Sequence, residues 1–213
     1  SVALLRMDFV NTFSHEFKTP LISIRGFAKL LQNDDLTPEQ RQTYTDTVVQ
    51  QSERLAAMST HVLELARYEN TEIVSDKTLY SLDEQLRRCV RQQEREWLKK
   101  SLTVEGDLDP VDYYGNEELV EHIWSNLLSN AIRFTPAGGQ ITVVLRRGEG
   151  EVTVSVSDTG IGMDEETQRH IFDRFYRAAP YPDDRGNGLG LSIVRRVVTL
   201  CGGRVTVFSR PGN

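Results

Sequence analysis

The chain has 213 residues and a formal net charge of -6, with 38% hydrophobic and 26% charged residues. This balance is typical of a folded soluble protein, and the length leads us to expect two small domains. No apolar run reaches the roughly 18 residues of a membrane-spanning helix, and the N-terminus lacks a signal-peptide pattern. The acidic charge and the scattered Lys and Arg residues argue against a nucleic-acid surface.

The first residues lie inside an amphipathic pattern that has no starting methionine, so we expect the chain to be a fragment. From residue 10 onward apolar residues recur in alternating steps of three and four, which predicts a helical heptad seam. The seam consists of Val10, Phe13, Phe17, Leu21, Ile24, Ala28 and Leu31. After a polar stretch at 33–35, residues 37–39 (TPE) are typical of a helix start, and a second apolar stripe follows from Tyr44 to Leu65.

The two predicted helices form a hairpin over residues 1–70. Each helix is apolar on one side only, so a single hairpin leaves part of its seam in water. A second copy would close the seam as a four-helix bundle, and we therefore expect a homodimer. Packing of the seam against the second domain is the alternative.

The pattern changes after a polar linker at 71–77. Period-two alternation at 140–145 and 152–157 predicts strands, and helical patterns cover 82–99, 116–134 and 189–200. This mixed order predicts an α+β fold for residues 78–213, an α/β sandwich with one sheet covered by helices on a single face. Cys89 and Cys201 stand outside any CxxC pair, which favours buried thiols in a reducing compartment over a disulfide or a metal site.

Asn126, Asn130 and Arg133 are spaced i, i+4, i+7, so they share one face of a predicted helix. An amide oxygen is a suitable Mg²⁺ ligand, and a nearby guanidinium can hold a phosphate. The alternative is that these residues are merely the solvated side of an amphipathic helix.

Residues 158–162 (DTGIG) follow the most clearly alternating strand. Asp158 would stand at the strand end, where its carboxylate can accept a hydrogen bond from an exocyclic amine such as that of adenine. Gly160 and Gly162 would form a tight turn after it. An ordinary turn that happens to contain an aspartate is the alternative.

Residues 186–190 (GNGLG) run directly into the last predicted helix. Gly186, Gly188 and Gly190 would let the backbone approach a phosphate, and the helix N-terminus with Leu189 would supply free amides. The segment is neither a Walker loop nor a Rossmann turn, and the HRD and DFG triplets of protein kinases are missing. Before it, Arg177 ends the sequence IFDRFYR and opens a loop that suits a lid over a polyphosphate, or is simply a surface loop.

In their order, these motifs resemble the N, G1, F and G2 boxes of the Bergerat-type ATP-binding domain of sensor histidine kinases. The matching segments are 126–135 (NLLSNAIRFT), 158–163 (DTGIGM), 171–177 (IFDRFYR) and 186–194 (GNGLGLSIV). The resemblance implies ATP and Mg²⁺ as cofactors. It also implies that Asn130 holds the metal, that Asp158 reads the adenine amine and Phe134 lines the base pocket, and that Arg133, Arg177 and the glycine loop bind phosphates.

Residues 14–20 (SHEFKTP) resemble the H box of the dimerisation and phosphoacceptor domain of the same family. His15 lies off the apolar seam, so its imidazole should face solvent and offer a lone pair to phosphorus. The resemblance implies that Glu16 accepts the other ring N–H and that Thr19 places a water for a phosphatase step. Pro20 cannot donate to the Glu16 carbonyl, so we expect the helix to bend there.

The resemblance implies a core that transfers the γ-phosphate of ATP to His15 and then to an aspartate of a response-regulator receiver domain. It implies a cytoplasmic fragment of a membrane-anchored parent, with no membrane contact of its own and a final strand missing after residue 213. Related ATPases and serine kinases carry a glutamate base where this chain has Asn126, which favours a histidine kinase. A catalytically silent scaffold would require a broken motif, and every motif is intact.

Overall fold

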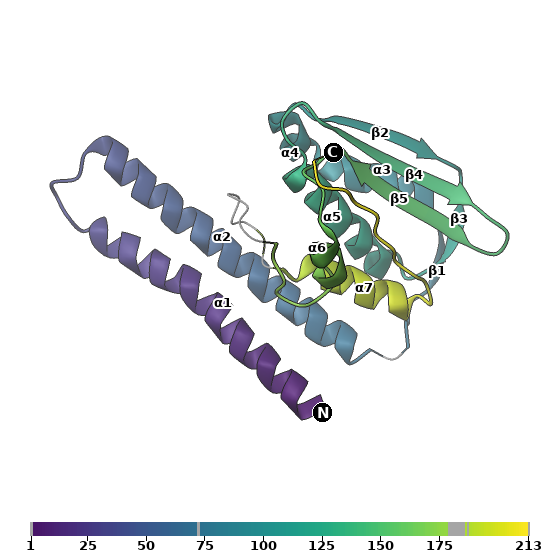
Figure 1. Cartoon of the computed structure of the whole chain (residues 1–213), viewed down its shortest axis with the longest axis horizontal. Helices are drawn as coiled ribbons and strands as arrows, with labels where there is room; N and C mark the ends of the chain where they lie inside the picture. The colour runs from purple at the N-terminus through teal and green to yellow at the C-terminus, as the bar shows by residue number, and fades with distance from the viewer. Residues whose placement is uncertain (1, 72, 179–185, 187, 213) are drawn as a thin grey trace. The chain divides into compact units, whose positions relative to one another are not determined.

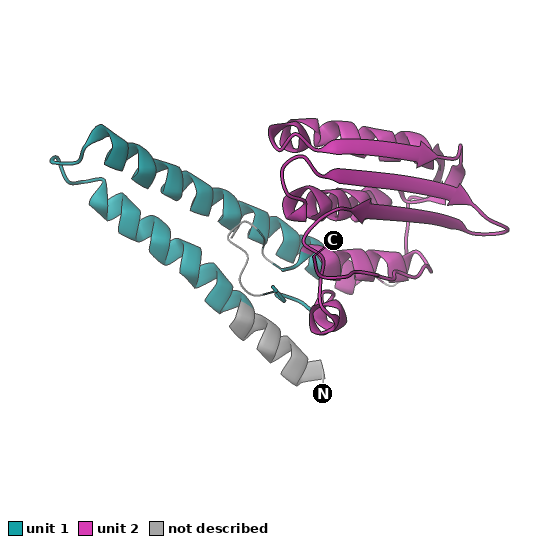
Figure 2. Cartoon of the chain, turned by 45° about the horizontal axis from the view of Figure 1, so that its top comes forward, with its two compact units in different colours: residues 1–67, 173–189 teal, residues 68–172, 190–213 magenta. Residues whose placement is uncertain are grey.

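The computed structural model describes residues 2–71, 73–178, 186 and 188–212, with side chains from residue 13 onward. The chain separates into two compact units (Figure 2). Unit 1 contains residues 1–67 and 173–189, and unit 2 contains residues 68–172 and 190–213. The domain boundaries expected at residues 70 and 77 remain a prediction. Among the described residues, every helix is too short or too polar to cross a bilayer.

Two long helices, α1 (Val2–Leu30) and α2 (Pro38–Glu69), form the predicted hairpin (Figure 1). A reciprocal pair of hydrogen bonds starts α2. The amide of Thr37 donates to Oε1 of Gln40 at 3.0 Å, and the amide of Gln40 donates to Oγ1 of Thr37 at 3.2 Å. This capping box satisfies amides that have no partner inside the helix, and Pro38 fits the first helical position because it has no amide hydrogen. The predicted helix start is confirmed.

One aromatic pair lies within the hairpin's first helix and another links its two helices: Phe13 and Phe17 both belong to α1, whereas Phe27 of α1 contacts Tyr44 of α2. The ring centroids of Phe13 and Phe17 lie 4.7 Å apart, and those of Phe27 and Tyr44 lie 5.4 Å apart. Leu21, in contrast, is 56% exposed. The hairpin therefore leaves part of its apolar seam in solvent, as expected for half of a larger bundle. The seam side chain of Val10 lies outside the described side chains.

The strands found among the described residues of unit 2 form two separate sheets. The larger has the order β2-β4-β5, with β2 (Thr103–Leu108) parallel to β4 (Gln140–Arg147) and β5 (Val152–Asp158) antiparallel to β4. In the smaller sheet, β1 (Thr78–Ser81) pairs antiparallel with β3 (Asp112–Gly115). The expectation of one sheet was wrong in this respect. Pro110, which has no amide hydrogen, interrupts the chain between β2 and β3.

Three helices of unit 2, covering residues 82–92, 117–134 and 190–200, lie on one side of the three-stranded sheet in Figure 2, so the predicted α+β organisation is confirmed. Alternate residues of β4, namely Ile141, Val143 and Leu145, are fully buried, as expected for a strand with one covered face. The helices described in unit 2 are α3 (Leu82–Gln92), α4 (Glu94–Lys99), α5 (Glu117–Phe134), α6 (Glu165–His170) and α7 (Gly190–Leu200).

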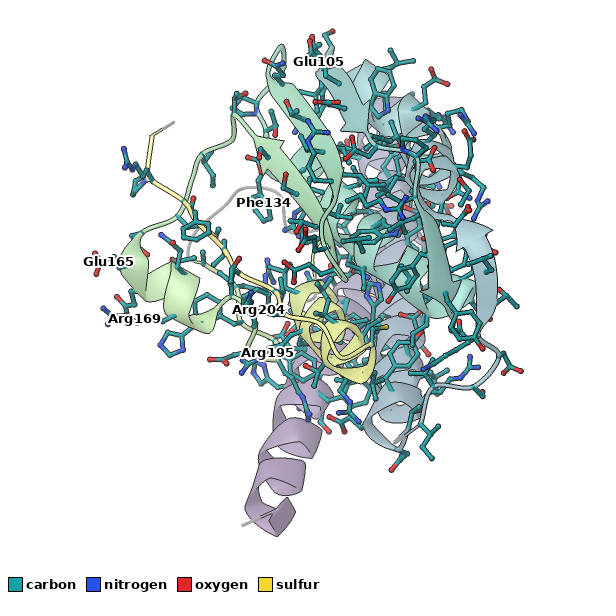
Figure 3. The ribbon with its side chains drawn as sticks, turned by 90° about the vertical axis from the view of Figure 1, so that its right-hand side faces the viewer. Glu105, Phe134, Glu165, Arg169, Arg195 and Arg204 are labelled. Carbon is teal, nitrogen blue, oxygen red and sulfur yellow. The ribbon has the colours of Figure 1, made fainter. Side chains whose placement is uncertain are left out.

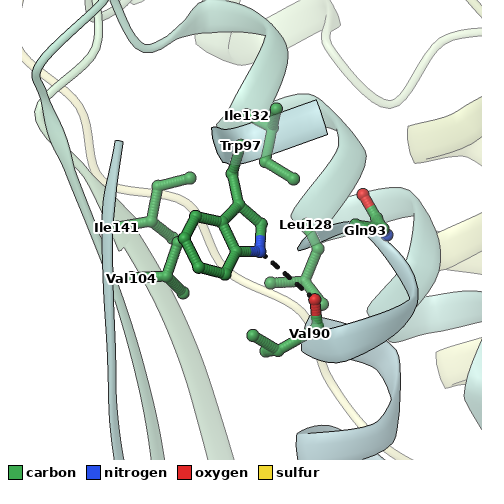
Figure 4. A pocket seen from close by; sticks show the side chains of 7 residues that line it. All are labelled: Val90, Gln93, Trp97, Val104, Leu128, Ile132 and Ile141. Atoms are coloured by element: carbon green, nitrogen blue, oxygen red, sulfur yellow. Dashed lines mark hydrogen bonds between the residues drawn. The ribbon is translucent and has the colours of Figure 1, made fainter. Parts of the chain in front are cut away.

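Trp97 closes the apolar interior beneath this sheet. Its ring lies among apolar side chains, and its Nε1 donates to the carbonyl of Val90 at 3.3 Å (Figure 4). The space around the ring is too small for a water molecule, so it is a packed core rather than a ligand site. The residues that line it are Val90, Gln93, Trp97, Val104, Leu128, Ile132 and Ile141.

Asp83 joins three parts of unit 2 at a buried position. Its carboxylate accepts hydrogen bonds from the Ser81 hydroxyl at 2.8 Å and the Val111 amide at 3.2 Å, and it pairs with Arg87 at 2.5 Å. Burial alone would raise the pKa of Asp83, but these donors outweigh it and lower the pKa to about 2. The Asp83 carboxylate therefore connects the end of β1, the first turn of α3 and the segment before β3.

Cys89 and Cys201 are free thiols; Cys89 is buried, as expected, whereas Cys201 is only half-buried. Cys89 is buried, and burial raises its pKa to about 11. Because the thiolate is the reactive form, a thiol with so high a pKa is inert near neutral pH. Cys89 is therefore a small core residue of α3.

Candidate functional site

His15 lies exposed on α1, as its place off the apolar seam predicted. The Thr19 hydroxyl donates to the His15 carbonyl at 3.3 Å, one helical turn back. Helix α1 continues through Pro20, which is buried and cannot donate to the Glu16 carbonyl. The His15 imidazole is therefore exposed to solvent, and the helix lacks one backbone hydrogen bond within the next turn. The bend expected at Pro20 remains a prediction.

Glu16, the next residue, points toward the other helix of the hairpin. Its Oε2 lies 3.7 Å from Nη2 of Arg54 on α2, and the two side chains are 26% and 6% exposed. Successive residues of a helix are about 100° apart around its axis, so His15 and Glu16 can face solvent and α2 respectively. This ion pair was not expected from the sequence.

Helix α5 carries the predicted amide face of unit 2. Its N-terminus is capped by Asn116, whose side chain accepts the Leu119 amide at 2.8 Å. Asn126, Asn130 and Arg133 are half-buried. The Asn126 side chain donates from Nδ2 to the His122 carbonyl at 2.8 Å, which fixes its amide plane.

Asn130 and Arg133 complete this face of α5. In the described part of the chain, the side-chain amide of Asn130 has no hydrogen-bonding partner, and its Oδ1 can accept a hydrogen bond. The guanidinium of Arg133 lies 4.9 Å from the centre of the Phe134 ring, a cation–π distance. Phe134, labelled in Figure 3, ends α5.

The turn after β5 packs against that end of α5. Oδ1 of Asp158 accepts the Gly160 amide at 2.9 Å, and the Ile161 amide donates to the Phe134 carbonyl at 3.3 Å. A Cβ at Gly160 would come within 2.8 Å of the same Phe134 carbonyl, closer than side chains tolerate. The glycine therefore allows the aspartate turn to touch the helix that carries the asparagines. Asp158 itself stays exposed at the strand end.

The second glycine of this turn meets the C-terminal segment. Gly162 has a φ of +67°, and a Cβ there would collide with the carbonyl of Arg210. The Met163 amide donates to the Ser209 hydroxyl at 2.9 Å, and the Gly212 amide donates to the Ile161 carbonyl at 3.0 Å. Residues 209–212 thus brace the aspartate turn from the other side.

The glycine-rich segment 186–190 is divided between the two units, and it makes contacts within each of them. In unit 2, a Cβ at Gly190 would lie 2.5 Å from Oδ1 of Asn126, so the start of α7 touches the asparagine face of α5. In unit 1, Gly188 has a φ of +68°, and its carbonyl accepts the Phe175 amide at 2.8 Å. Leu189 is fully buried.

The structure therefore brings together Asn126 and Gly190, and also Phe134, Gly160 and Asp158, within unit 2. His15, Glu16 and Thr19 belong to unit 1, as do Arg177, which is exposed, and the loop residues Gly186, Gly188 and Leu189. Asn187 and most of the predicted lid, residues 179–185, lie outside the described residues. Within the described residues, no group of three acidic, histidine or cysteine side chains could hold a metal.

Sequence reasoning missed two residues beside these motifs. Arg54 is a cation within the apolar stripe of α2, and a charge at such a position signals a buried partner. Thr159 bonds the turn to β4, since its amide donates to the Gln140 carbonyl at 3.0 Å and its hydroxyl accepts the Gln140 amide at 2.9 Å. A threonine directly after a strand-end aspartate gave no such signal.

Two protein-family models match this chain, one in each half. Residues 5–71 match the His Kinase A (phospho-acceptor) domain, and residues 115–213 match the histidine kinase-, DNA gyrase B-, and HSP90-like ATPase family. The chain thus belongs to the sensor histidine kinases, of which it forms the core: a phosphoacceptor domain followed by an ATPase-type domain.

Individual relatives cover nearly the whole chain. The heme sensor protein HssS of Staphylococcus saprophyticus is 31% identical over 96% of this chain and 44% of its own. Full-length ShkA, solved in complex with AMPPNP, is 29% identical over 92% of this chain and 41% of its own, with a TM-score of 0.65. ThkA, solved with the response regulator TrrA, shares the fold with a TM-score of 0.76 at 23% identity, over 92% of this chain and 55% of its own. The chain spans less than half the length of HssS.

Proposed function

We propose that this chain uses ATP to phosphorylate its own His15 and passes the phosphate to an aspartate of a response regulator. One observation carries the proposal: helix α5 touches Gly190 through Asn126 and touches Gly160 through Phe134. Two motifs that lie far apart in the sequence thus adjoin the helix that carries the third. A strand-end carboxylate can accept the adenine amine, an amide face can hold a metal, and a helix N-terminus can bind phosphate, so the combination suits an adenine nucleotide.

The nucleotide contacts follow from the chemistry of each group. Asp158, exposed at the end of β5, accepts a hydrogen bond from the adenine amine, while Phe134 packs against the base. Arg133 and Arg177 pair with phosphate oxygens, because a planar guanidinium bonds them in bidentate fashion. The backbone at 186–190 approaches the phosphates and presents the amides at the start of α7.

The residues on α5 fit Mg²⁺. A carbonyl oxygen of a half-buried amide is a hard, neutral ligand, and Mg²⁺ needs only one or two protein ligands when phosphates and waters complete its octahedron. Asn130 would hold the ion, which neutralises charge on the phosphates when bound. Such a site needs no cluster of carboxylates.

The exposed imidazole of His15 supplies the nucleophile. In the transfer, a bond forms between a ring nitrogen and the γ-phosphorus, and the bond from that phosphorus to the β,γ-bridging oxygen breaks, so that ADP leaves. The proton on the other ring nitrogen is shared with Glu16, which supports the positive charge that develops on the ring. In-line placement of donor and acceptor accounts for much of the acceleration.

The hairpin dimerises through the apolar side chains that it leaves in solvent. A four-helix bundle made of two hairpins would bury residues that a single chain cannot. The large apolar residues exposed on the hairpin are Leu21, Ile22, Leu30, Val49 and Leu63. The response regulator then docks beside His15, where Thr19 takes part in dephosphorylating it, and the parent protein is anchored in the membrane.

Labelling with γ-³²P-ATP and Mg²⁺ tests the proposal. We expect protein-bound phosphate that is labile to acid and stable to base. The variant His15→Gln should lose this label while it still binds AMPPNP in a calorimetric titration, and Asn130→Asp should weaken Mg²⁺-dependent nucleotide binding. His170→Gln removes another exposed histidine and should label normally. Label on His15→Gln, or release of free phosphate without protein-bound label, would contradict the proposal.

A further inference from the structure

Arg54 is a charged side chain at a buried position of the hairpin. Its side chain is 6% exposed, although a guanidinium remains protonated at every relevant pH. A buried charge is tolerated only beside an opposite charge. Within unit 1 the carboxylate of Glu16 lies 3.7 Å away and is one such charge.

The distance between these groups matters for what Glu16 can still do. At 3.7 Å the two groups attract each other as charges, but the contact is too long for a hydrogen bond. The carboxylate therefore keeps its lone pairs for a hydrogen-bond donor. Glu16 directly follows His15, whose ring has one N–H to donate when the other nitrogen attacks phosphorus.

We propose that Arg54 is a positioning residue for phosphoryl transfer, which holds the Glu16 carboxylate between the helices so that it accepts the ring N–H of His15. In this role Arg54 acts through Glu16 and not on the reacting atoms. This inference rests on the proposed function of His15. The motif around His15 lies entirely on α1. The inference adds a residue of α2 to the groups that support the chemistry.

A double-mutant cycle separates this role from a purely structural one. The rate of autophosphorylation at saturating ATP is measured for wild type, Arg54→Met, Glu16→Gln and the double variant. We expect Arg54→Met to lower the rate about tenfold, which is the typical loss when a residue that orients a functional side chain is removed. The KM for ATP should stay unchanged. In the Glu16→Gln background the same change should have no further effect.

Two more variants serve as controls. Arg54→Lys keeps the charge and should recover most of the wild-type rate. Arg25→Met makes the same chemical change at an exposed position of α1 and should label normally. Sedimentation equilibrium reports whether each variant still assembles, and Arg54→Gln replaces Arg54→Met in the cycle if the latter fails to fold.

Several results would overturn the inference. A wild-type rate for Arg54→Met, an equal loss from Arg54→Met in both backgrounds, or a lysine variant as slow as the methionine variant would each do so. Failure of the proposed function looks different, because the wild-type protein would then carry no label or His15→Gln would still be labelled.

Discussion

The guanidinium of Arg196 on α7 donates to the carbonyl of Tyr68, at the end of α2, at 3.0 Å. It also donates to the carbonyls of Glu69 at 3.3 Å and Thr71 at 2.9 Å. The last carbonyls of a helix have no partner within it, and a cation is favoured there. Helix α7, which begins at the glycine-rich segment, thus caps the end of α2 inside unit 2.

Replacing Arg196 with methionine should loosen residues 68–71. The change removes hydrogen bonds from a charged donor, each contributing about 2 kcal/mol, so backbone amides near Thr71 should exchange with solvent faster. Hydrogen-exchange mass spectrometry measures this. Arg195→Met, on the exposed side of the same helix (Figure 3), should leave the exchange unchanged. Equal protection in both variants would show that the cap contributes nothing.

Gly190→Ala should weaken nucleotide binding. The added Cβ would lie 2.5 Å from Oδ1 of Asn126, so either the Asn126 amide or the start of α7 must shift, and overpacking of this kind costs about 1–3 kcal/mol. We expect roughly a tenfold lower affinity for AMPPNP by calorimetry. Gly106→Ala is the matched control, because a Cβ there meets only Leu108 at ordinary contact distance. Unchanged affinity in Gly190→Ala would contradict the close approach of these two elements.

Asp83 makes the stability of unit 2 depend on pH. Its pKa is lowered to about 2, from 3.8, so its stabilisation is fully present above about pH 4 and is lost as the pH falls through 2. The shift corresponds to about 2 kcal/mol. Urea unfolding should show that Asp83→Asn is less stable than wild type at pH 7, and that the difference roughly halves at pH 3. A constant difference would show that the charge is not responsible.

Leu21→Glu should dissociate the dimer. Leu21 lies on the heptad seam yet is 56% exposed in the single chain, and a carboxylate buried there in a bundle would be unpaired. Sedimentation equilibrium should shift toward the monomer by at least tenfold in the dissociation constant. Leu79→Glu changes an equally exposed leucine, 68% exposed and in unit 2, and should leave assembly unchanged. If Leu21→Glu remained dimeric, the seam would be the wrong interface.

The sequence predicted the elements whose pattern is local. The helix start at residues 37–39, the heptad steps of α1 and the alternation in β5 each depend on residues a few positions apart, and the structure has the corresponding helices and strand. The short strands β1, β2 and β3 were missed. They are 4–6 residues long and exposed at half or more of their positions, so their sequences carry little hydrophobic periodicity.

Within the site, the motif residues could be predicted from the sequence, but the contacts that hold them in place could not. Asn126 was chosen for its place on a helix face, but its contact with Gly190 joins residues 64 positions apart in the numbering and depends on how α5 and α7 pack. Arg54 and Arg196 depend in the same way on tertiary structure. An isolated arginine in a helix gives no indication of which carboxylate or carbonyl it will meet.

The most direct test of the account is to map the phosphate itself. The protein is incubated with ATP and Mg²⁺, digested at neutral to basic pH so that phosphohistidine survives, and fragmented by electron transfer in the mass spectrometer. The account predicts phosphate on His15 and on no other residue. Phosphate on a serine, threonine or another histidine, with His15 unmodified, would contradict it.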